Sequence, residues 1–137
     1  MSAERIDGKA ISLSLRESMK PRAAEFEKRY GRKIGLAVVK VGNDPASEVY
    51  VRNKIKACAE VGLKSFSYDL PEDTPEAALI ELIDTLNGDP AVDGILVQLP
   101  LPKSINEKKV LARILPEKDA DGFHVVNAGG LMLGLPC

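Results

Sequence analysis

Aromatic residues are scarce in this chain of 137 residues: they make up 4% of it and tryptophan is absent, which leaves little material for stacking nucleic-acid bases. The formal net charge is −1, so neither nucleic acid nor an anionic membrane has an electrostatic reason to bind. No hydrophobic run is long enough to span a bilayer, and the first residues lack the apolar core of a signal peptide. We therefore expect a cytoplasmic protein that binds neither nucleic acid nor membrane.

Residues that hold metals and nucleotides are also few. Cys58 and Cys137 make neither a disulfide framework nor a zinc set, and His124 is the only histidine, expected to pack in a loop. Asp119 and Asp121 share a polar loop, but the other ligands of a calcium loop are missing, so we expect no metal. No glycine-rich dinucleotide motif or phosphate loop occurs, so no cofactor-binding residue is expected in this chain.

Helical and extended patterns alternate along the chain, with 45% hydrophobic residues to build one core. Helices are expected at about 9–30, 46–61, 74–86 and 107–114, and strands at 34–41, 64–70 and from Gly94 to the proline at 100. Pro21 should kink or split the first helix, and Thr74 should cap the third, with Pro75 at its first position. The pattern predicts an α/β fold, a three-layer sandwich whose mostly parallel central sheet is flanked by helices.

The run DGILVQLPLP, residues 93–102, is the most informative segment. It opens with a turn dipeptide and reaches a proline that cannot donate to a sheet ladder. Gln98 lies near the carboxyl end of the apolar part, and a buried amide is costly unless it is hydrogen-bonded. Gln98 therefore either satisfies loop backbone or faces a ligand, because ligands of open α/β sheets bind beyond the carboxyl ends of strands.

Lys54 falls on the apolar face of the helix expected at 46–61. At about 100° per residue, Ser47 and Tyr50 lie beside it, whereas Arg52 and Lys56 fall on the opposite side. Such a lysine either extends its ammonium to water or lines a cleft, where desolvation lowers its pKa and allows proton transfer near neutral pH. If Gln98 lies close by, its carbonyl can orient the Lys54 amine without adding a charge.

Asp121 stands before a glycine in a polar loop. Asp-Gly pairs are common in simple turns, and such a turn is one explanation of this pair. The alternative is a carboxylate that accepts two hydrogen bonds from a heterocyclic ligand.

Three stretches together resemble one enzyme family. They are VGNDPASEVYVRNK at 41–54, DGILVQLPLP at 93–102 and PEKDADGFH at 116–124. In sequence, order and spacing they are similar to the bifunctional methylenetetrahydrofolate dehydrogenase/methenyltetrahydrofolate cyclohydrolase family, and the resemblance extends over nearly the whole chain. It implies that residues 1–137 form a folate-binding catalytic domain whose ligands are tetrahydrofolate derivatives.

The resemblance also implies roles for individual residues. Lys54 would transfer protons in the cyclohydrolase step, Gln98 would tune it, and Tyr50 would complete the catalytic group. Asp121 would hold the pterin ring. The substrate-binding residues implied are Ser47, Tyr50, Gln98, Leu99, Pro100 and Asp121.

The chain departs from the family in length. The family's enzymes continue into an NADP-binding domain and are expected to be homodimers, whereas this sequence reaches Cys137 without a terminal cap and looks cut. The family reaction transfers a hydride from methylenetetrahydrofolate to NADP and then hydrolyses the methenyl product to 10-formyltetrahydrofolate. For the chain alone, folate binding without turnover, a non-enzymatic α/β interaction module and a small-molecule enzyme of unrelated chemistry are the alternatives.

Overall fold

The computed structural model describes residues 6–135, and its centre is a parallel sheet. The strands β1 (Gly35–Val41), β2 (Lys64–Leu70) and β3 (Gly94–Val97) are hydrogen-bonded in the order β2-β1-β3. Both pairs are parallel. All three carboxyl ends therefore lie along one edge of the sheet, where ligands of α/β folds bind.

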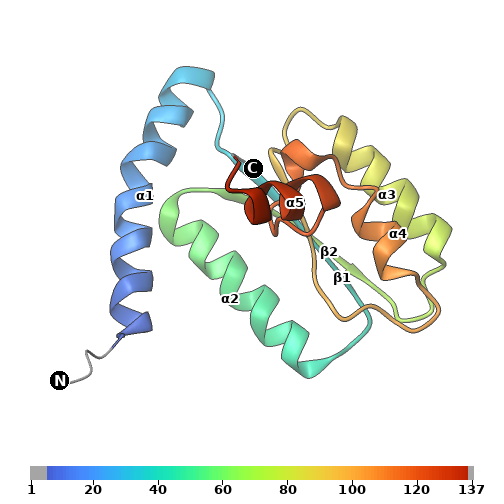
Figure 1. The fold of residues 1–137 in the computed structure, drawn as a ribbon. Helices are drawn as coiled ribbons and strands as arrows, with labels where there is room; N and C mark the ends of the chain where they lie inside the picture. The colour runs from blue at the N-terminus through green and yellow to red at the C-terminus, as the bar shows by residue number, and fades with distance from the viewer. Residues whose placement is uncertain (1–5, 136–137) are drawn as a thin grey trace.

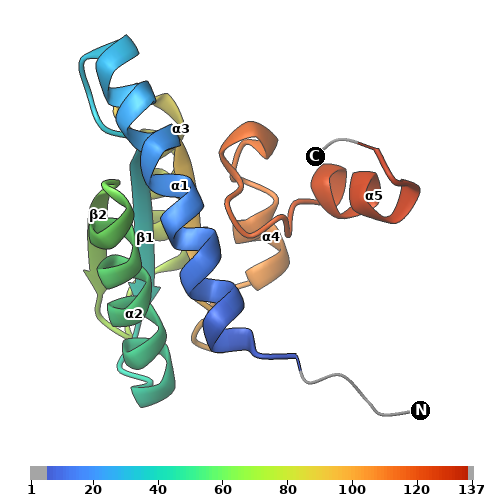
Figure 2. The ribbon, with the colours of Figure 1, turned by 90° about the vertical axis from the view of Figure 1, so that its left-hand side faces the viewer.

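Helices cover both faces of this sheet (Figure 1). They are α1 (Gly8–Tyr30), α2 (Pro45–Val61), α3 (Glu76–Gly88), α4 (Glu107–Leu111), the short 3₁₀ helix η1 (Pro116–Lys118) and α5 (Val125–Leu133). Figure 1 shows α1 and α2 on one side of the strands and α3 and α4 on the other. Seen from the side, α5 stands beyond α4, away from the sheet (Figure 2). The predicted α/β fold with a parallel central sheet is confirmed.

Alternate residues of β1 build the two layers of core. Ala37, Val39 and Val41 pack with the buried side chains of α3 and with Val110 of α4. Val38 belongs to a smaller cluster on the opposite face, with side chains of α2. A strand whose successive side chains point to opposite faces needs apolar residues on both faces when both are covered, which explains the apolar run from Leu36 to Val39.

The first helix is not split at Pro21. α1 runs through that position as one helix, since a proline removes one backbone donor while the neighbouring turns keep theirs. Of its residues only Ala23 is buried, and Leu15 and Met19 remain largely exposed. Within residues 6–135, no helix is long and apolar enough to cross a membrane.

Two predicted helix ends were wrong. Thr74 does not cap α3: its hydroxyl donates to the Pro71 carbonyl at 2.6 Å, and Pro75 occupies the cap position without a side-chain hydrogen bond. The helix near residue 107 ends at Leu111 rather than Ile114, because a turn follows and leads into η1. The third strand also ends early, at Val97 rather than at Pro100, whereas the remaining predicted elements lie within two residues of the observed bounds.

Candidate functional site

Gln98 follows the last residue of β3, at the carboxyl edge of the sheet. Its backbone N–H donates to the Val39 carbonyl at 2.8 Å and extends the pairing of β3 with β1 by one bond. Its side-chain Nε2 donates to the Leu99 carbonyl at 2.7 Å. These two bonds leave Oε1 free to accept from elsewhere, and it accepts from Lys54.

Lys54 reaches Gln98 from the middle of α2. The helix starts directly after β1 because Asp44 caps it, accepting from the Ser47 N–H at 2.7 Å, and Pro45 fits the first helical position. Lys54 is half-buried, and its Nζ donates to Gln98 Oε1 at 3.3 Å. The helical wheel predicts Lys54 on the apolar face of this helix, and this contact brings Lys54 together with Gln98, the other residue that the sequence favours for a site.

Asp121 comes to the same edge on a third segment. Asp119 forms an isolated parallel bridge with Ile95, and the Ala120 N–H donates to the Ile95 carbonyl at 3.1 Å. The chain turns directly after this bridge, and the Asp121 carboxyl lies close enough to Lys54 to be affected by its charge. Although much of the residue is exposed, partial desolvation raises the pKa of its carboxyl, the charge on Lys54 opposes that shift, and Asp119 adds to it.

The remaining predicted residues lie on α2 and in the segment after β3, and they differ in burial. Ser47 is buried at the start of α2, with 4% of its surface exposed. Tyr50 lies one turn before Lys54 and is 62% exposed, so its ring is available to a ligand. Leu99 packs partly against the core, and a cis peptide joins it to the exposed Pro100.

A second lysine, Lys40 on β1, is more deeply buried than Lys54 but differs in its partners. Only 5% of Lys40 is exposed, and its Nζ lies 3.1 Å from an Asp69 carboxylate oxygen and 3.4 Å from one of Glu48. The hydrogen bond with Asp69 raises the pKa of Lys40, which keeps it an ammonium ion. Lys54 instead donates to the neutral amide of Gln98, and the carboxylate that acts on its charge is that of the exposed Asp121.

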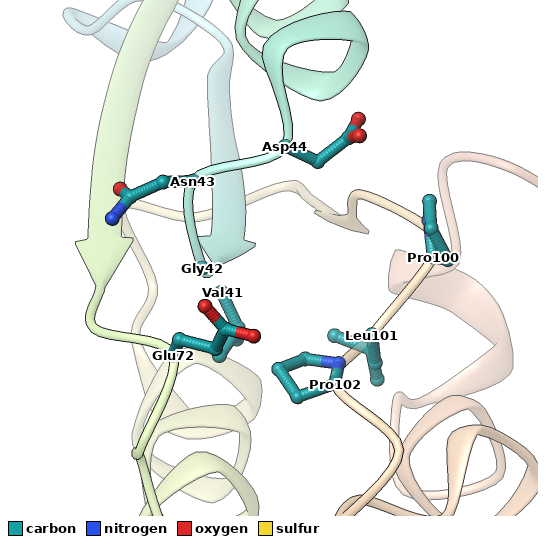
Figure 3. Close-up of a pocket in the computed structure, with 8 residues that line it drawn as sticks. All are labelled: Val41, Gly42, Asn43, Asp44, Glu72, Pro100, Leu101 and Pro102. Carbon is teal, nitrogen blue, oxygen red and sulfur yellow. The ribbon is translucent and has the colours of Figure 1, made fainter.

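A cavity of about 300 Å³ opens where the chain leaves all three strands (Figure 3). Its lining residues are Val41, Gly42, Asn43, Asp44, Glu72, Pro100, Leu101 and Pro102. In Figure 3 the Asp44 side chain points toward the side of Pro100, whereas that of Asn43 points away. Lys54, Gln98 and Asp121 are not among the lining residues, so we take the polar cluster, which holds the groups able to move protons, as the candidate site.

In the part of the chain that the structure describes, no three His, Cys, Asp or Glu side chains gather into a group that could hold a metal ion. His124 caps α5, its Nδ1 accepting from the Val126 N–H at 3.2 Å. Cys58 is buried, and desolvation raises the pKa of its thiol, as expected of a packed structural cysteine. Cys137 lies outside the described residues.

Sequence reasoning missed one side chain near the site. The sequence suggests only a metal ligand for Asp119, yet its Oδ2 accepts from the His124 N–H at 2.8 Å and from Asn127 Nδ2 at 2.9 Å. No pattern within the loop distinguishes Asp119 from Asp121, because both are aspartates in the same short polar segment. The sequence signal that separates them is the resemblance, which singles out the aspartate before the glycine.

The comparisons with known proteins agree with this geometry. The profile of the family described as "Tetrahydrofolate dehydrogenase/cyclohydrolase, catalytic domain" matches residues 6–121, most of the chain. The chain belongs to this family. The family resemblance predicted from the three stretches is thereby confirmed.

Individual relatives give the extent of the match. The bifunctional protein FolD of Erythrobacter litoralis is 57% identical over 100% of this chain and 47% of its own length. Bifunctional FolD from Campylobacter jejuni is 49% identical in sequence to this chain. Its crystal structure matches with a TM-score of 0.89, over 94% of this chain and 45% of that one. The Trypanosoma brucei enzyme, complexed with NADP cofactor and inhibitor, is 40% identical, with a TM-score of 0.90 over 96% and 45%. The chain spans about half the length of the relatives it matches.

Proposed function

We propose that this chain is the folate-binding catalytic domain of a methylenetetrahydrofolate dehydrogenase/methenyltetrahydrofolate cyclohydrolase, and that its ligands are tetrahydrofolate derivatives. The observation that carries the proposal is the 3.3 Å contact of Lys54 Nζ with Gln98 Oε1, in a member of this family. Its support is that the contact joins a proton-transfer group to a neutral orienting group at the sheet edge where ligands bind. Ser47, Tyr50, Leu99 and Pro100 are the proposed substrate-binding neighbours.

The cyclohydrolase step explains what each group does. Water adds to the methenyl cation, and Lys54, when its amine is deprotonated, accepts the proton that the water loses. The resulting ammonium returns that proton to the nitrogen that leaves as the ring opens. The hydroxyl proton of the water adduct is released to solvent as the formyl C=O forms, giving 10-formyltetrahydrofolate. Gln98 orients the amine through its carbonyl, and Asp121 accepts hydrogen bonds from the pterin ring.

NADP belongs to the dehydrogenase step of a full-length enzyme. The solved relative from Trypanosoma brucei was complexed with NADP, but no residue of this chain forms a glycine-rich dinucleotide motif. The residues present do not fit that cofactor, so no step of the mechanism runs through it here. Homodimer formation and a cytoplasmic location remain predictions for the full-length enzyme.

The test is hydrolysis of methenyltetrahydrofolate by the chain, followed as loss of the methenyl absorbance. We expect a rate above that of buffer, and a drop of roughly 10²-fold or more in Lys54→Met because general acid–base catalysis is lost. Lys56→Met is the matched control: it removes an exposed lysine from the opposite face of the same helix and should leave the rate unchanged.

A wild-type rate equal to buffer would overturn the catalytic part of the proposal. Thermal unfolding with 5-formyltetrahydrofolate then separates two alternatives, because a ligand that binds the folded state raises the melting temperature. A rise that Lys54→Met diminishes would indicate folate binding without turnover. No rise at all would favour a non-enzymatic module.

A further inference from the structure

The turn that carries Asp121 is fixed on its upstream side by main-chain bonds of Asp119 and Ala120. The Ala120 N–H donates to the Ile95 carbonyl at 3.1 Å, which ties the segment to the edge of β3. The Gly122 N–H donates to the Asp119 carbonyl at 3.4 Å, and Gly122 adopts a φ of 70°, a left-handed conformation that glycine takes without strain. Asp121 therefore sits within a tight turn that begins at Asp119.

The downstream side of the turn is held by the Asp119 carboxylate. Its Oδ2 accepts from the His124 N–H at 2.8 Å and from Asn127 Nδ2 at 2.9 Å. Asn127 Nδ2 also donates to the Pro116 carbonyl at 2.8 Å, which links the start of α5 to the segment before the turn. Hydrogen bonds to a carboxylate are stronger than neutral ones, so a single side chain closes the loop around Asp121.

We propose that Asp119 and Asn127 are positioning residues: together they form a clamp that holds the Asp121 carboxylate beside Lys54. Asp119 directs its Oδ2 to the main chain and to Asn127, so the two aspartates of this loop have different tasks despite their shared chemistry. The identity of the bound ligand rests on the proposed function, whereas the clamp itself is independent of it.

The clamp is tested by titrating the Asp121 carboxyl by NMR in the intact chain. In the wild type, partial burial and the charge of Asp119 raise the pKa of Asp121. In Asn127→Ala the turn loosens and the carboxyl gains water, so its pKa should move toward the ordinary value. The matched control is Asn87→Ala, which removes an amide that bonds the Arg113 carbonyl and the Leu115 N–H at the far end of α3.

Both variants should unfold cooperatively, but Asn87→Ala should leave the Asp121 titration unchanged. An unchanged titration in folded Asn127→Ala would overturn the clamp. A second readout is the affinity for 5-formyltetrahydrofolate by calorimetry, which should fall about tenfold in Asn127→Ala, the equivalent of one hydrogen bond.

Substitutions of Asp119 itself separate positioning from simple loss of structure. Asp119→Ala should weaken folate binding more than Asp119→Asn, because the asparagine carbonyl can still accept from the His124 N–H. Equal wild-type and Asn127→Ala affinities would overturn the positioning role. If the wild type bound no folate while the titration shifted as expected, the proposed function would fail and the clamp would stand.

Discussion

The two ends of β3 hold polar side chains in opposite conditions. At the amino end, Asp93 accepts from Arg32 through two bonds of 2.6 and 2.7 Å and from the Gly35 N–H at 2.8 Å. At the carboxyl end, Gln98 accepts from Lys54 at 3.3 Å. Polar groups that stabilise the fold have their hydrogen bonds filled by the protein, whereas those of the candidate site keep hydrogen-bonding capacity for a ligand.

The pKa values of the carboxyl groups near the two ends, Asp93 and Asp121, are shifted in opposite directions. Arg32 beside Asp93 holds the pKa of that carboxyl below its ordinary value, so ionisation of Asp93 stabilises the folded state. Desolvation raises the pKa of Asp121, so its ionisation opposes folding. Asp93, at the amino end, therefore stabilises the folded state through its charge. Asp121, near the carboxyl end, carries a charge that lowers the stability of the folded state.

The largest effect should follow from breaking the amino end with Asp93→Ala. The change removes the carboxylate that pairs with Arg32 and leaves the Gly35 N–H without its acceptor, which should lower the free energy of unfolding by about 2 kcal/mol. The stability that Asp93 contributes is present above its unfolded pKa and is lost as the pH falls through the lowered folded pKa. Urea unfolding at several pH values should therefore show the difference from wild type narrowing below about pH 4.

Asp84→Ala provides the matched comparison for this variant. Asp84 also forms a two-bond pair with an arginine, Arg113, but on a more exposed surface and without a main-chain donor. Its loss should destabilise the chain less than that of Asp93, and neither variant should change the melting-temperature rise produced by 5-formyltetrahydrofolate. An equal fall in the free energy of unfolding in the two variants would contradict a larger contribution of Asp93 to stability.

A smaller effect on stability is expected at the carboxyl end from Gln98→Leu. Lys54 is half-exposed and can turn to water, so the free energy of unfolding should change by less than about 1 kcal/mol. Without its orienting carbonyl, however, Lys54 should hydrolyse methenyltetrahydrofolate about tenfold more slowly.

Gln98→Glu tests the same role of Gln98 by replacing its neutral amide with a carboxylate. A carboxylate at this position favours the ammonium form of Lys54, so the rate should fall and its pH profile should shift to higher pH while stability is kept. Loss of stability in both variants, with an unaltered rate, would show that Gln98 belongs to the structural class of Asp93.

Local patterns explain why most of the fold could be predicted. The apolar run of β1 and the glycine after α2, which adopts a φ of 93°, are signals contained in a few adjacent residues. Thr74 shows the limit of such signals: a threonine before a proline fits a cap, but its hydroxyl bonds to Pro71 because the turn before α3 offers that carbonyl. The choice between two local partners depends on backbone geometry.

In the candidate site, too, some contacts could be predicted from local patterns and others could not. The approach of Lys54 to Gln98 could be predicted because both follow carboxyl ends of parallel strands, and topology brings those ends together. The pairing of Arg32 with Asp93 joins residues 61 positions apart, and no pattern in either segment points to the other. The bonds of Asp119 were hidden for the same reason, since they depend on how the loop closes against α5.

The smallest expected effect is a gain in stability from Asp121→Asn. The raised pKa of Asp121 means that its ionisation opposes folding once the pH exceeds the unfolded pKa, so removing the charge should stabilise the chain at pH 7 by no more than about 0.5 kcal/mol. The gain should vanish near pH 3, where the carboxyl is protonated in both states.

Asp73→Asn, in an exposed turn before α3, is the control and should not change the free energy of unfolding. Urea unfolding at pH 7 and pH 3 measures the difference, and calorimetry with 5-formyltetrahydrofolate measures binding by the same samples. A variant that is more stable yet binds folate less well would show that the carboxyl end of β3 keeps its charge for the ligand. A loss of stability at pH 7 would instead place Asp121 with Asp93, among the groups that hold the fold together.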